Sequence, residues 1–235
     1  MPTMILVRHG RTSINASGVL AGRTPGIGLD DLGRTQAKQL GERLAALPYS
    51  RVVTSPLQRC METAEALVAA RPSAVIVPDD RLIECGYGDW TGHPLKELAK
   101  ERLWRVVQVH PSAATFPGEG GEAMRDMQAR AVASVRDWDA RIAQEDGPEA
   151  VWVACSHGDV IKAVVADALG LHLDLFQRIV AEPAGVSVIS YTELRPFVIR
   201  LNDTGSLDGL VPKRRRGRRR RPVSTAPVGG GAGAS

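Results

Sequence analysis

The sequence predicts an α/β fold with a mostly parallel sheet, and three observations support it. Segments typical of buried strands alternate along the chain with segments of helical periodicity. Two apolar runs, residues 5–7 and 151–154, each lead into a His-Gly pair, at His9 and at His157. The length of 235 residues suffices for one such domain with a full core. Because ligands of open α/β sheets bind beyond the carboxyl ends of strands, both histidines are expected at that edge.

The opening stretch, residues 4–15, reads MILVRHGRTSIN. Its apolar run stops at Arg8 and His9, and Gly10 then allows the backbone to turn beneath them. An Arg-His pair at a strand end suits an anionic substrate. The alternative is an ordinary strand that ends in two solvated polar residues. A glycine-rich loop over residues 17–30 follows and is expected to lie beside this strand end.

A first helix is predicted after this loop, with Asp30 and Asp31 as candidate N-cap carboxylates. Its apolar positions recur at helical spacing as far as Leu47, and Pro48 ends it. The apolar face of this helix should pack on the sheet.

A short β-branched strand, residues 51–55, comes next. The following helix is predicted to begin at Pro56 with Ser55 as its cap, which places Arg59 in the first turn. Free amides at a helix N-terminus attract phosphate, and an arginine there adds two donors suited to phosphate oxygens. The alternative is a surface helix on which Arg59 is solvated.

The segment at residues 81–92, RLIECGYGDWTG, contains Glu84 near Tyr87 and Trp90. A carboxyl group beside apolar surface can retain its proton through desolvation, as a general acid must. A purely structural loop, with Trp90 covering the edge of the core, is the alternative.

The second half of the chain contains a predicted insertion and then the second strand-His-Gly-helix unit. Helical spacing over residues 94–110, broken by prolines and glycines at 111–121, indicates a cap at about residues 92–122. A long helix with Met124 and Met127 in the core is expected next. His157 ends the apolar strand before a helix at 160–169, which Gly170 closes. Residues 186–191 and 197–201 predict a final hairpin.

The charge of the chain is unevenly distributed. Residues 213–216 and 218–221 carry eight positive charges, and without them 22 basic residues face 26 acidic ones. We therefore expect a mildly acidic domain at residues 1–203 and a disordered Arg-rich and Gly-rich tail at 204–235. Such a tail is either a solubilising segment or a weak, salt-dependent contact for nucleic acid or acidic partners.

Composition indicates a cytoplasmic protein without disulfides. The chain has no apolar run near the roughly 20 residues of a membrane helix, and it starts without a signal-peptide pattern. Its three cysteines, Cys60, Cys85 and Cys155, lack the spacing of a zinc site, so buried neutral thiols are expected.

Four ordered segments resemble the histidine phosphatase superfamily, branch 1, the phosphoglycerate mutase-like group. They are LVRHGRTSIN, SPLQRCMETA, ECGYGDWTG and CSHGDVIKAV, and the resemblance covers about residues 4–200. Phosphatases and phosphomutases of actinobacterial type are the most similar members. The resemblance implies a three-layer α/β/α sandwich with a small helical cap, and a homodimer is common in the group.

The resemblance also implies a role for each matching residue. His9 would be the nucleophile, Glu84 the proton donor, and Arg8 and Arg59 the phosphate clamp. His157 would complete the phosphate pocket, with supporting contacts from Asn15 and Thr12. Two arginines and two histidines can neutralise a transferring phosphoryl group without a metal, so no cofactor is expected. Cys60 stands where the group often has threonine.

These expectations favour a metal-independent phosphomonoesterase that acts on a small phosphorylated metabolite through a phosphohistidine. A phosphoglycerate mutase-type phosphomutase is the nearest enzyme alternative. The region that would hold basic residues for a substrate carboxylate is short here, which favours the phosphatase. A non-catalytic phospholigand sensor, or a nucleic-acid adaptor that uses the tail, is the alternative of another class. The natural substrate is left open, because specificity belongs to the cap.

Overall fold

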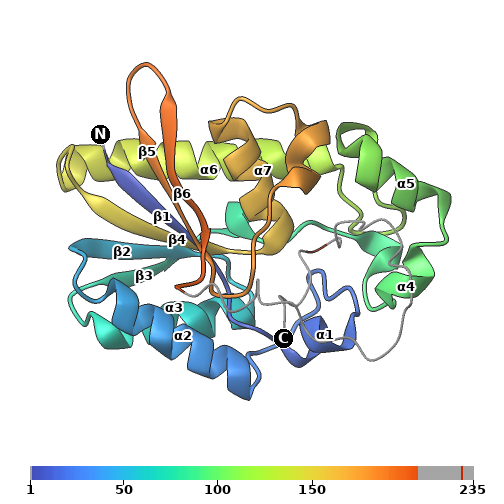
Figure 1. The fold of residues 1–235 in the computed structure, drawn as a ribbon, viewed down its shortest axis with the longest axis horizontal. Helices are drawn as coiled ribbons and strands as arrows, with labels where there is room; N and C mark the ends of the chain where they lie inside the picture. The colour runs from blue at the N-terminus through green and yellow to red at the C-terminus, as the bar shows by residue number, and fades with distance from the viewer. Residues whose placement is uncertain (1, 206–228, 230–235) are drawn as a thin grey trace, which may run out of the picture.

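A computed structural model of the protein describes residues 2–205 and Gly229 and contains a six-stranded sheet (Figure 1). The strands lie in the order β3-β2-β4-β1-β5-β6, in which the first four are parallel and β5 runs antiparallel to both of its neighbours, β1 and β6. The strand bounds are β1 Thr3–Arg8, β2 Tyr49–Thr54, β3 Val75–Pro78, β4 Val151–Ser156, β5 Val186–Tyr191 and β6 Pro196–Asp203. The predicted α/β fold, its mostly parallel sheet and the C-terminal hairpin are confirmed.

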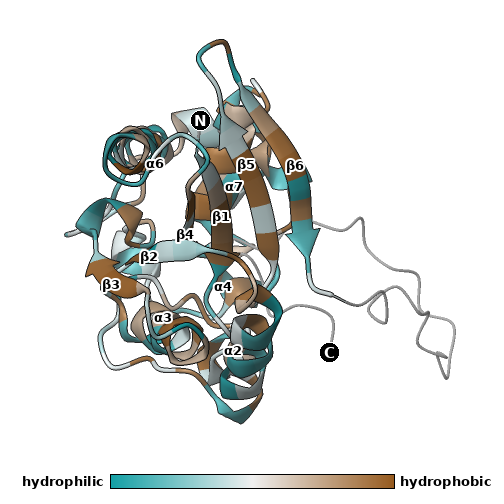
Figure 2. Cartoon of the chain, turned by 90° about the vertical axis from the view of Figure 1, so that its left-hand side faces the viewer, coloured by the Kyte–Doolittle hydropathy of each residue, from teal (hydrophilic) through white to brown (hydrophobic). Residues whose placement is uncertain are grey.

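Helices cover both faces of the sheet, which gives the three layers expected (Figure 2). Helices α2 and α3 pack together on one face, and α6 and α7 pack together on the other. The helix bounds are α1 Ser13–Ser17, α2 Asp31–Leu44, α3 Gln58–Ala70, α4 Leu95–Leu98, α5 Arg102–Val109, α6 Met124–Glu145 and α7 Gly158–Ala168. Short 3-10 helices are η1 Asp80–Leu82, η2 Gly88–Trp90, η3 Pro111–Ala113 and η4 Leu173–Arg178.

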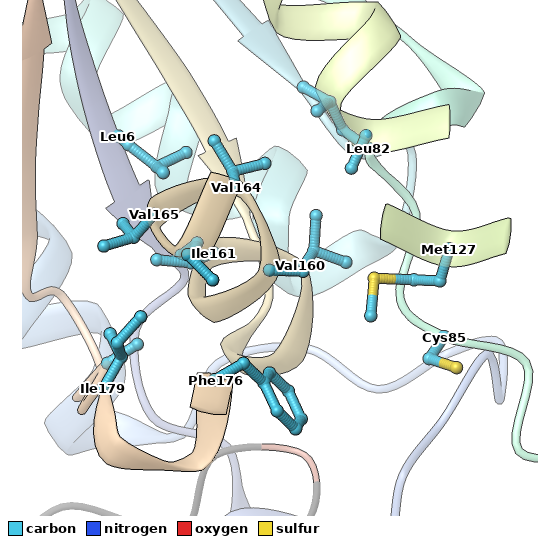
Figure 3. Packing of buried hydrophobic residues seen from close by; sticks show 14 of the residues in the cluster. Leu6, Leu82, Cys85, Met127, Val160, Ile161, Val164, Val165, Phe176 and Ile179 are labelled. Carbon is cyan, nitrogen blue, oxygen red and sulfur yellow. The ribbon is translucent and has the colours of Figure 1, made fainter. Parts of the chain in front are cut away.

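The central strand β1 is buried from both sides, as its unbroken apolar run predicts. Met4 and Leu6 join the core beneath α6 and α7, whereas Ile5 and Val7 join the core beneath α2 and α3. Figure 3 shows the first core, where side chains of α7 such as Val160 lie close to those of neighbouring elements. Each fully buried aliphatic side chain of this kind contributes about 1.5–3 kcal/mol. The sheet is therefore a rigid base for residues at its edge.

Two predicted helix boundaries were wrong. The second helix, α3, begins at Gln58 after Leu57 as N-cap, so neither Pro56 nor Ser55 has the position expected for it. Arg59 nevertheless falls in the first turn, as predicted. The earlier helix, α2, begins after Asp30 as its N-cap but ends at Leu44, which leaves Leu47 37% exposed beyond it. Leu47 continues the apolar spacing of this helix in the sequence, but it lies in the turn that follows the helix.

The region predicted as a cap, about residues 92–122, forms the short helices α4, α5 and η3. The helix predicted from the methionine pattern is α6, and Met124 and Met127 are fully buried in it. The predicted tail at 204–235, with its basic cluster, lies outside the described residues except for 204, 205 and Gly229. Within the described ranges, no helix is long and apolar enough to cross a membrane.

Candidate active site

His9 and His157 lie side by side because their strands are neighbours. Arg8 at the end of β1 is in register with Ser156 at the end of β4, and the histidines are the next residues on each strand. The backbone N–H of His9 donates to the Ser156 carbonyl at 3.1 Å. The two imidazole centroids are 5.2 Å apart. Both side chains are buried at the carboxyl edge of the sheet, where the sequence places them.

The ring of His9 has a defined orientation and charge state. Its Nδ1 lies 2.7 Å from the carbonyl oxygen of Gly10, which can only accept, so Nδ1 carries the proton. Burial, followed by the positive charges of Arg59 and Arg8, holds the pKa of His9 well below its usual range. The ring is therefore neutral at pH 7, and the lone pair on Nε2 is available for attack on an electrophile.

Gly10 also allows a close contact that holds this loop. A Cβ at residue 10 would lie 2.5 Å from the Gly33 carbonyl oxygen of α2, which excludes any side chain there without a backbone shift. The Gly10 N–H donates to the Thr63 hydroxyl of α3 at 3.1 Å. The backbone directly after His9 is thus fixed against both α2 and α3.

His157 is held by Ser55, whose predicted role as a helix cap proved wrong. The Ser55 hydroxyl and Nε2 of His157 are 2.7 Å apart, and the Cys60 sulfur lies 3.5 Å from the same nitrogen. Burial and then the charge of Arg59 lower the pKa of His157 well below its usual range. The second imidazole is consequently neutral and hydrogen-bonded, with a thiol packed beside it.

Two buried arginines supply the positive charge of the site. Arg8 donates through NH1 to the Ala181 carbonyl at 2.7 Å and through NH2 to the Gly229 carbonyl at 3.1 Å. Burial lowers the pKa of Arg8 to about 10, so it is still charged at pH 7. Arg59 donates through NH2 to the Gly22 carbonyl at 2.8 Å.

NH1 of Arg59 differs from the hydrogen-bonded guanidinium nitrogens described above. It is buried and has no hydrogen-bond partner among the described residues. Such a group costs about 1–3 kcal/mol, and more when it is charged, unless a ligand satisfies it. This donor therefore indicates an anion-binding position next to the histidines, whose pKa values the same arginine lowers.

Glu84 is a buried carboxyl group in the same site. Its Oε1 accepts a hydrogen bond from the backbone N–H of the next residue, Cys85, at 2.9 Å. Desolvation, followed by the negative charge of Asp159, raises the pKa of Glu84 to about 7. A substantial fraction of Glu84 is therefore protonated at neutral pH, which is the state that a general acid needs.

A network that the sequence reasoning missed holds the backbone of Glu84. Its carbonyl accepts from Arg23 Nε at 2.8 Å and from Arg130 NH2 at 3.2 Å. Glu122 forms an ion pair with each arginine: its Oε2 lies 2.8 Å from Arg23 NH2, and its Oε1 lies 2.7 Å from Arg130 Nε. Glu122 also accepts from the Gly86 N–H at 3.0 Å. These three side chains come from distant segments, and no local motif in the sequence marks them.

Asp159 and Tyr87 are also absent from the predicted set. Asp159 follows the His157-Gly158 pair, is fully buried, and accepts from the Tyr87 hydroxyl at 2.8 Å. Its position two residues after the second histidine is the one signal in the sequence that could have drawn attention to it.

Asn15 and Thr12, the two residues predicted to make supporting contacts in the phosphate pocket, have different positions. Asn15 lines the pocket, whereas Thr12 is the N-cap of α1 and accepts from the Asn15 N–H at 3.1 Å. Thr12 therefore orients Asn15, and its predicted phosphate contact stays a prediction.

A pocket lies beside these groups, and His9 and Glu84 are part of its lining. It encloses about 370 Å³ of empty space, part of it open to solvent. Its lining comprises His9, Asn15, Val19, Leu20, Ala21, Gly22, Glu84, Tyr87, Leu95 and Gly229. His9 offers the pocket a neutral nucleophilic imidazole, and Glu84 offers a carboxyl group able to give up a proton. The guanidinium groups of Arg8 and Arg59 contact this lining through the carbonyl oxygens of Gly229 and Gly22. This arrangement suits transfer of an anionic group to His9 with protonation of whatever departs.

Comparison with known proteins points to the same chemistry. The family described as "Histidine phosphatase superfamily (branch 1)" matches residues 4–204. Glucosyl-3-phosphoglycerate phosphatase of Mycolicibacterium vanbaalenii is 33% identical over 178 residues, which cover 73% of this chain and 76% of that protein. The 2,3-bisphosphoglycerate-dependent phosphoglycerate mutase of Brucella ovis is 33% identical over 135 residues, 54% and 64% of the two chains.

A solved structure extends the likeness to three dimensions. Mycobacterial glucosyl-3-phosphoglycerate phosphatase, in complex with VO3, superimposes with a TM-score of 0.74 at 27% sequence identity. The match covers 85% of this chain and 98% of the other.

Proposed function

Because the chain belongs to branch 1 of the histidine phosphatase superfamily, we propose that it hydrolyses a small phosphomonoester through a phosphohistidine on His9. The observation that carries the proposal is the neutral His9, whose Nδ1 is held by the Gly10 carbonyl and whose Nε2 is left for attack. The arginine donor without a partner, NH1 of Arg59, supports binding of the phosphoryl group beside that nitrogen.

The first half-reaction transfers the phosphoryl group to the enzyme. Nε2 of His9 attacks phosphorus, a P–N bond forms, and the P–O bond to the leaving alcohol breaks. The proton of Glu84 passes to the departing oxygen, so the alcohol leaves neutral. Arg8, Arg59 and His157 stabilise the charge spread over the three equatorial oxygens.

The second half-reaction restores the enzyme. The carboxylate of Glu84 takes a proton from a water molecule, whose oxygen attacks phosphorus, and the P–N bond breaks. Inorganic phosphate leaves, His9 regains its lone pair, and Glu84 is again protonated. Since the side chains supply both the positive charge and the proton, we propose that the reaction needs no metal.

Phosphatase activity is proposed in preference to mutase activity. A mutase must retain the departed alcohol and return the phosphoryl group to another of its oxygens. The segment between η2 and α6 contains only the short helices α4 and α5 and the 3-10 helix η3, and of their residues Leu95 lines the pocket. No basic side chain of that segment is among the residues that line the pocket, which supports the choice of a phosphatase.

A phosphate-release screen over many phosphorylated metabolites, performed in EDTA with wild type and His9→Ala, tests the proposal. Wild type should release phosphate and carry a phosphoryl group on His9 during turnover, whereas His9→Ala should do neither. Activity that survives His9→Ala, or that EDTA abolishes, would contradict the mechanism. Interconversion of 3-phosphoglycerate and 2-phosphoglycerate faster than phosphate release would favour the mutase.

A further inference from the structure

Asp159 is a buried carboxylate at the edge of the pocket, and the proposed mechanism gives it no contact with the reacting atoms. It is the second residue of α7 and has no exposed surface. Its Oδ1 lies 3.3 Å from the Lys162 ammonium. Its Oδ2 accepts from the Tyr87 hydroxyl at 2.8 Å and from the backbone N–H of Gly229 at 3.0 Å. Tyr87 and Gly229 both line the pocket that holds His9.

Gly229 connects Asp159 to the phosphate clamp. While its N–H donates to Asp159, its carbonyl oxygen accepts from NH2 of Arg8 at 3.1 Å. A small polar group thus fits between the two, with its acceptor on the arginine and its donor on the carboxylate. Only three covalent bonds separate the nitrogen and the carbonyl oxygen of one residue. Arg8 and Asp159 thus take an acceptor and a donor that lie close together in space. A phosphoryl oxygen and a donor on the carbon next to the ester carbon, five bonds apart, reach such a separation when the chain between them is bent.

The other contacts of Asp159 fix the direction of its carboxylate. Lys162 holds Oδ1, and its ammonium is itself kept in place 4.3 Å from the Phe176 ring centroid and by a hydrogen bond to Gln177. The remaining oxygen, Oδ2, is the one that receives Tyr87 and Gly229 from the pocket side. A carboxylate anchored by one oxygen is a preorganised acceptor for a ligand at the other.

We infer that Asp159 is a substrate-binding residue that accepts a hydrogen bond from a hydroxyl or ammonium group on the carbon next to the ester carbon. This inference rests on the proposed function. A bound substrate would replace both contacts of Gly229, with a phosphoryl oxygen on Arg8 and the neighbouring donor on Asp159. The substrate class is then the monophosphates of 1,2-diols and of 1,2-amino alcohols, rather than those of simple alcohols.

The test compares three phosphate esters of equal length: 2-hydroxyethyl phosphate, 2-aminoethyl phosphate and propyl phosphate. Wild type should prefer the two donor-bearing esters in kcat/KM by about 10-fold or more, since a hydrogen bond to a charged group is worth about that factor. Asp159→Asn should remove most of this preference, so that the kcat/KM ratio between each donor-bearing ester and propyl phosphate falls toward one. The ratio between esters cancels any general effect of the substitution on Glu84.

A second variant keeps the test decisive if Asp159→Asn fails to fold. Tyr87→Phe removes a competing donor from Oδ2 and leaves the carboxylate in place. The preference for donor-bearing esters should then be maintained or increased, and a fall toward equality would contradict the inference. Equal kcat/KM for all three esters with wild type would overturn the assignment of Asp159 alone. No phosphate release from any ester, or from the metabolite screen, would overturn the proposed function itself.

Discussion

His9 and His157 pack edge to face at a ring-centroid distance of 5.2 Å, and burial followed by the charge of Arg59 lowers the pKa of both. Two protonated imidazoles at this distance, beside two arginines, would repel strongly in a buried site. The pair is therefore stable as two neutral rings. One ring is available for attack, while the other is hydrogen-bonded to Ser55.

The pH profile should be set by Glu84 on its alkaline side. Its pKa is raised to about 7, and the acid must be protonated in the first half-reaction, so kcat/KM should fall as pH rises above that value. Glu84→Gln should lower kcat by about 10²–10⁴-fold and abolish this alkaline limb. The measurement is kcat/KM between pH 4 and 9.

An aryl phosphate with a good leaving group is the matched control for Glu84. Its alcohol needs less protonation, so Glu84→Gln should be much less damaging with it than with an alkyl phosphate. The comparison uses kcat/KM, which reports the first half-reaction, and equal losses of kcat/KM with both substrates would show that Glu84 acts other than as the acid.

Two substitutions at Arg59 should separate its charge from its geometry. Arg59→Lys keeps a positive charge near the histidines but loses the planar pair of donors, so KM should rise about 10-fold. The acidic limb of the pH profile, on which kcat/KM falls as His9 becomes protonated, should change little. Arg59→Gln removes the charge that lowers the pKa of His9, so that limb should move to higher pH. If both variants move the limb equally, the electrostatic role assigned to Arg59 is wrong.

Loss of Glu122 should affect turnover more than binding. Glu122→Gln weakens the pairs with Arg23 and Arg130, which both hold the Glu84 carbonyl, so the acid should lose alignment. We expect kcat to fall by about 10-fold, as for a misplaced catalytic group, with KM within about twofold. Steady-state kinetics measure both.

The ion pair of Arg136 with Asp167 provides the control for Glu122, because Arg136 is 58% exposed in its side chain. Asp167→Asn should leave kcat and thermal stability nearly unchanged, as expected for a surface pair. A rise in KM without a change in kcat for Glu122→Gln would place Glu122 in substrate binding instead.

The three cysteines should resist modification in the folded protein. Cys60, Cys85 and Cys155 are buried free thiols. Burial raises the pKa of Cys60 and of Cys85 well above the usual range, which removes the reactive thiolate. Mass spectrometry after brief iodoacetamide treatment should find no adduct on the native protein and three after denaturation in guanidinium. Rapid labelling of native Cys60 would indicate an open route to the site.

Much of the fold could be predicted because local signals and tertiary contacts agree. The apolar run before His9 and its counterpart before His157 form adjacent parallel strands, as their sequence pattern suggests. Helix boundaries were less predictable. Ser55 and Pro56 have the pattern of a helix start, but the Ser55 hydroxyl is bonded to His157, which is more than 100 positions away in sequence.

The candidate site could be only partly predicted for a similar reason. His9 follows a strand and Arg59 lies in the first turn of a helix, so a local pattern identifies them. Glu84 lies in the loop after η1 and was predicted from the apolar residues near it in sequence. Arg130 and Glu122 act on Glu84 from another segment, and their function is visible only when α6 is packed in place. Asp159 has Tyr87 as partner across 72 positions.

The strand order has a consequence for synthesis of the protein. β1 pairs with β4 and β5, which both come from the second half of the chain. A ribosome makes about 5–20 residues per second, so β1 has no partner strand for several seconds after it emerges. An apolar strand without a partner is a template for aggregation during that interval. Truncated chains that end before Val151 should therefore require chaperones to remain soluble.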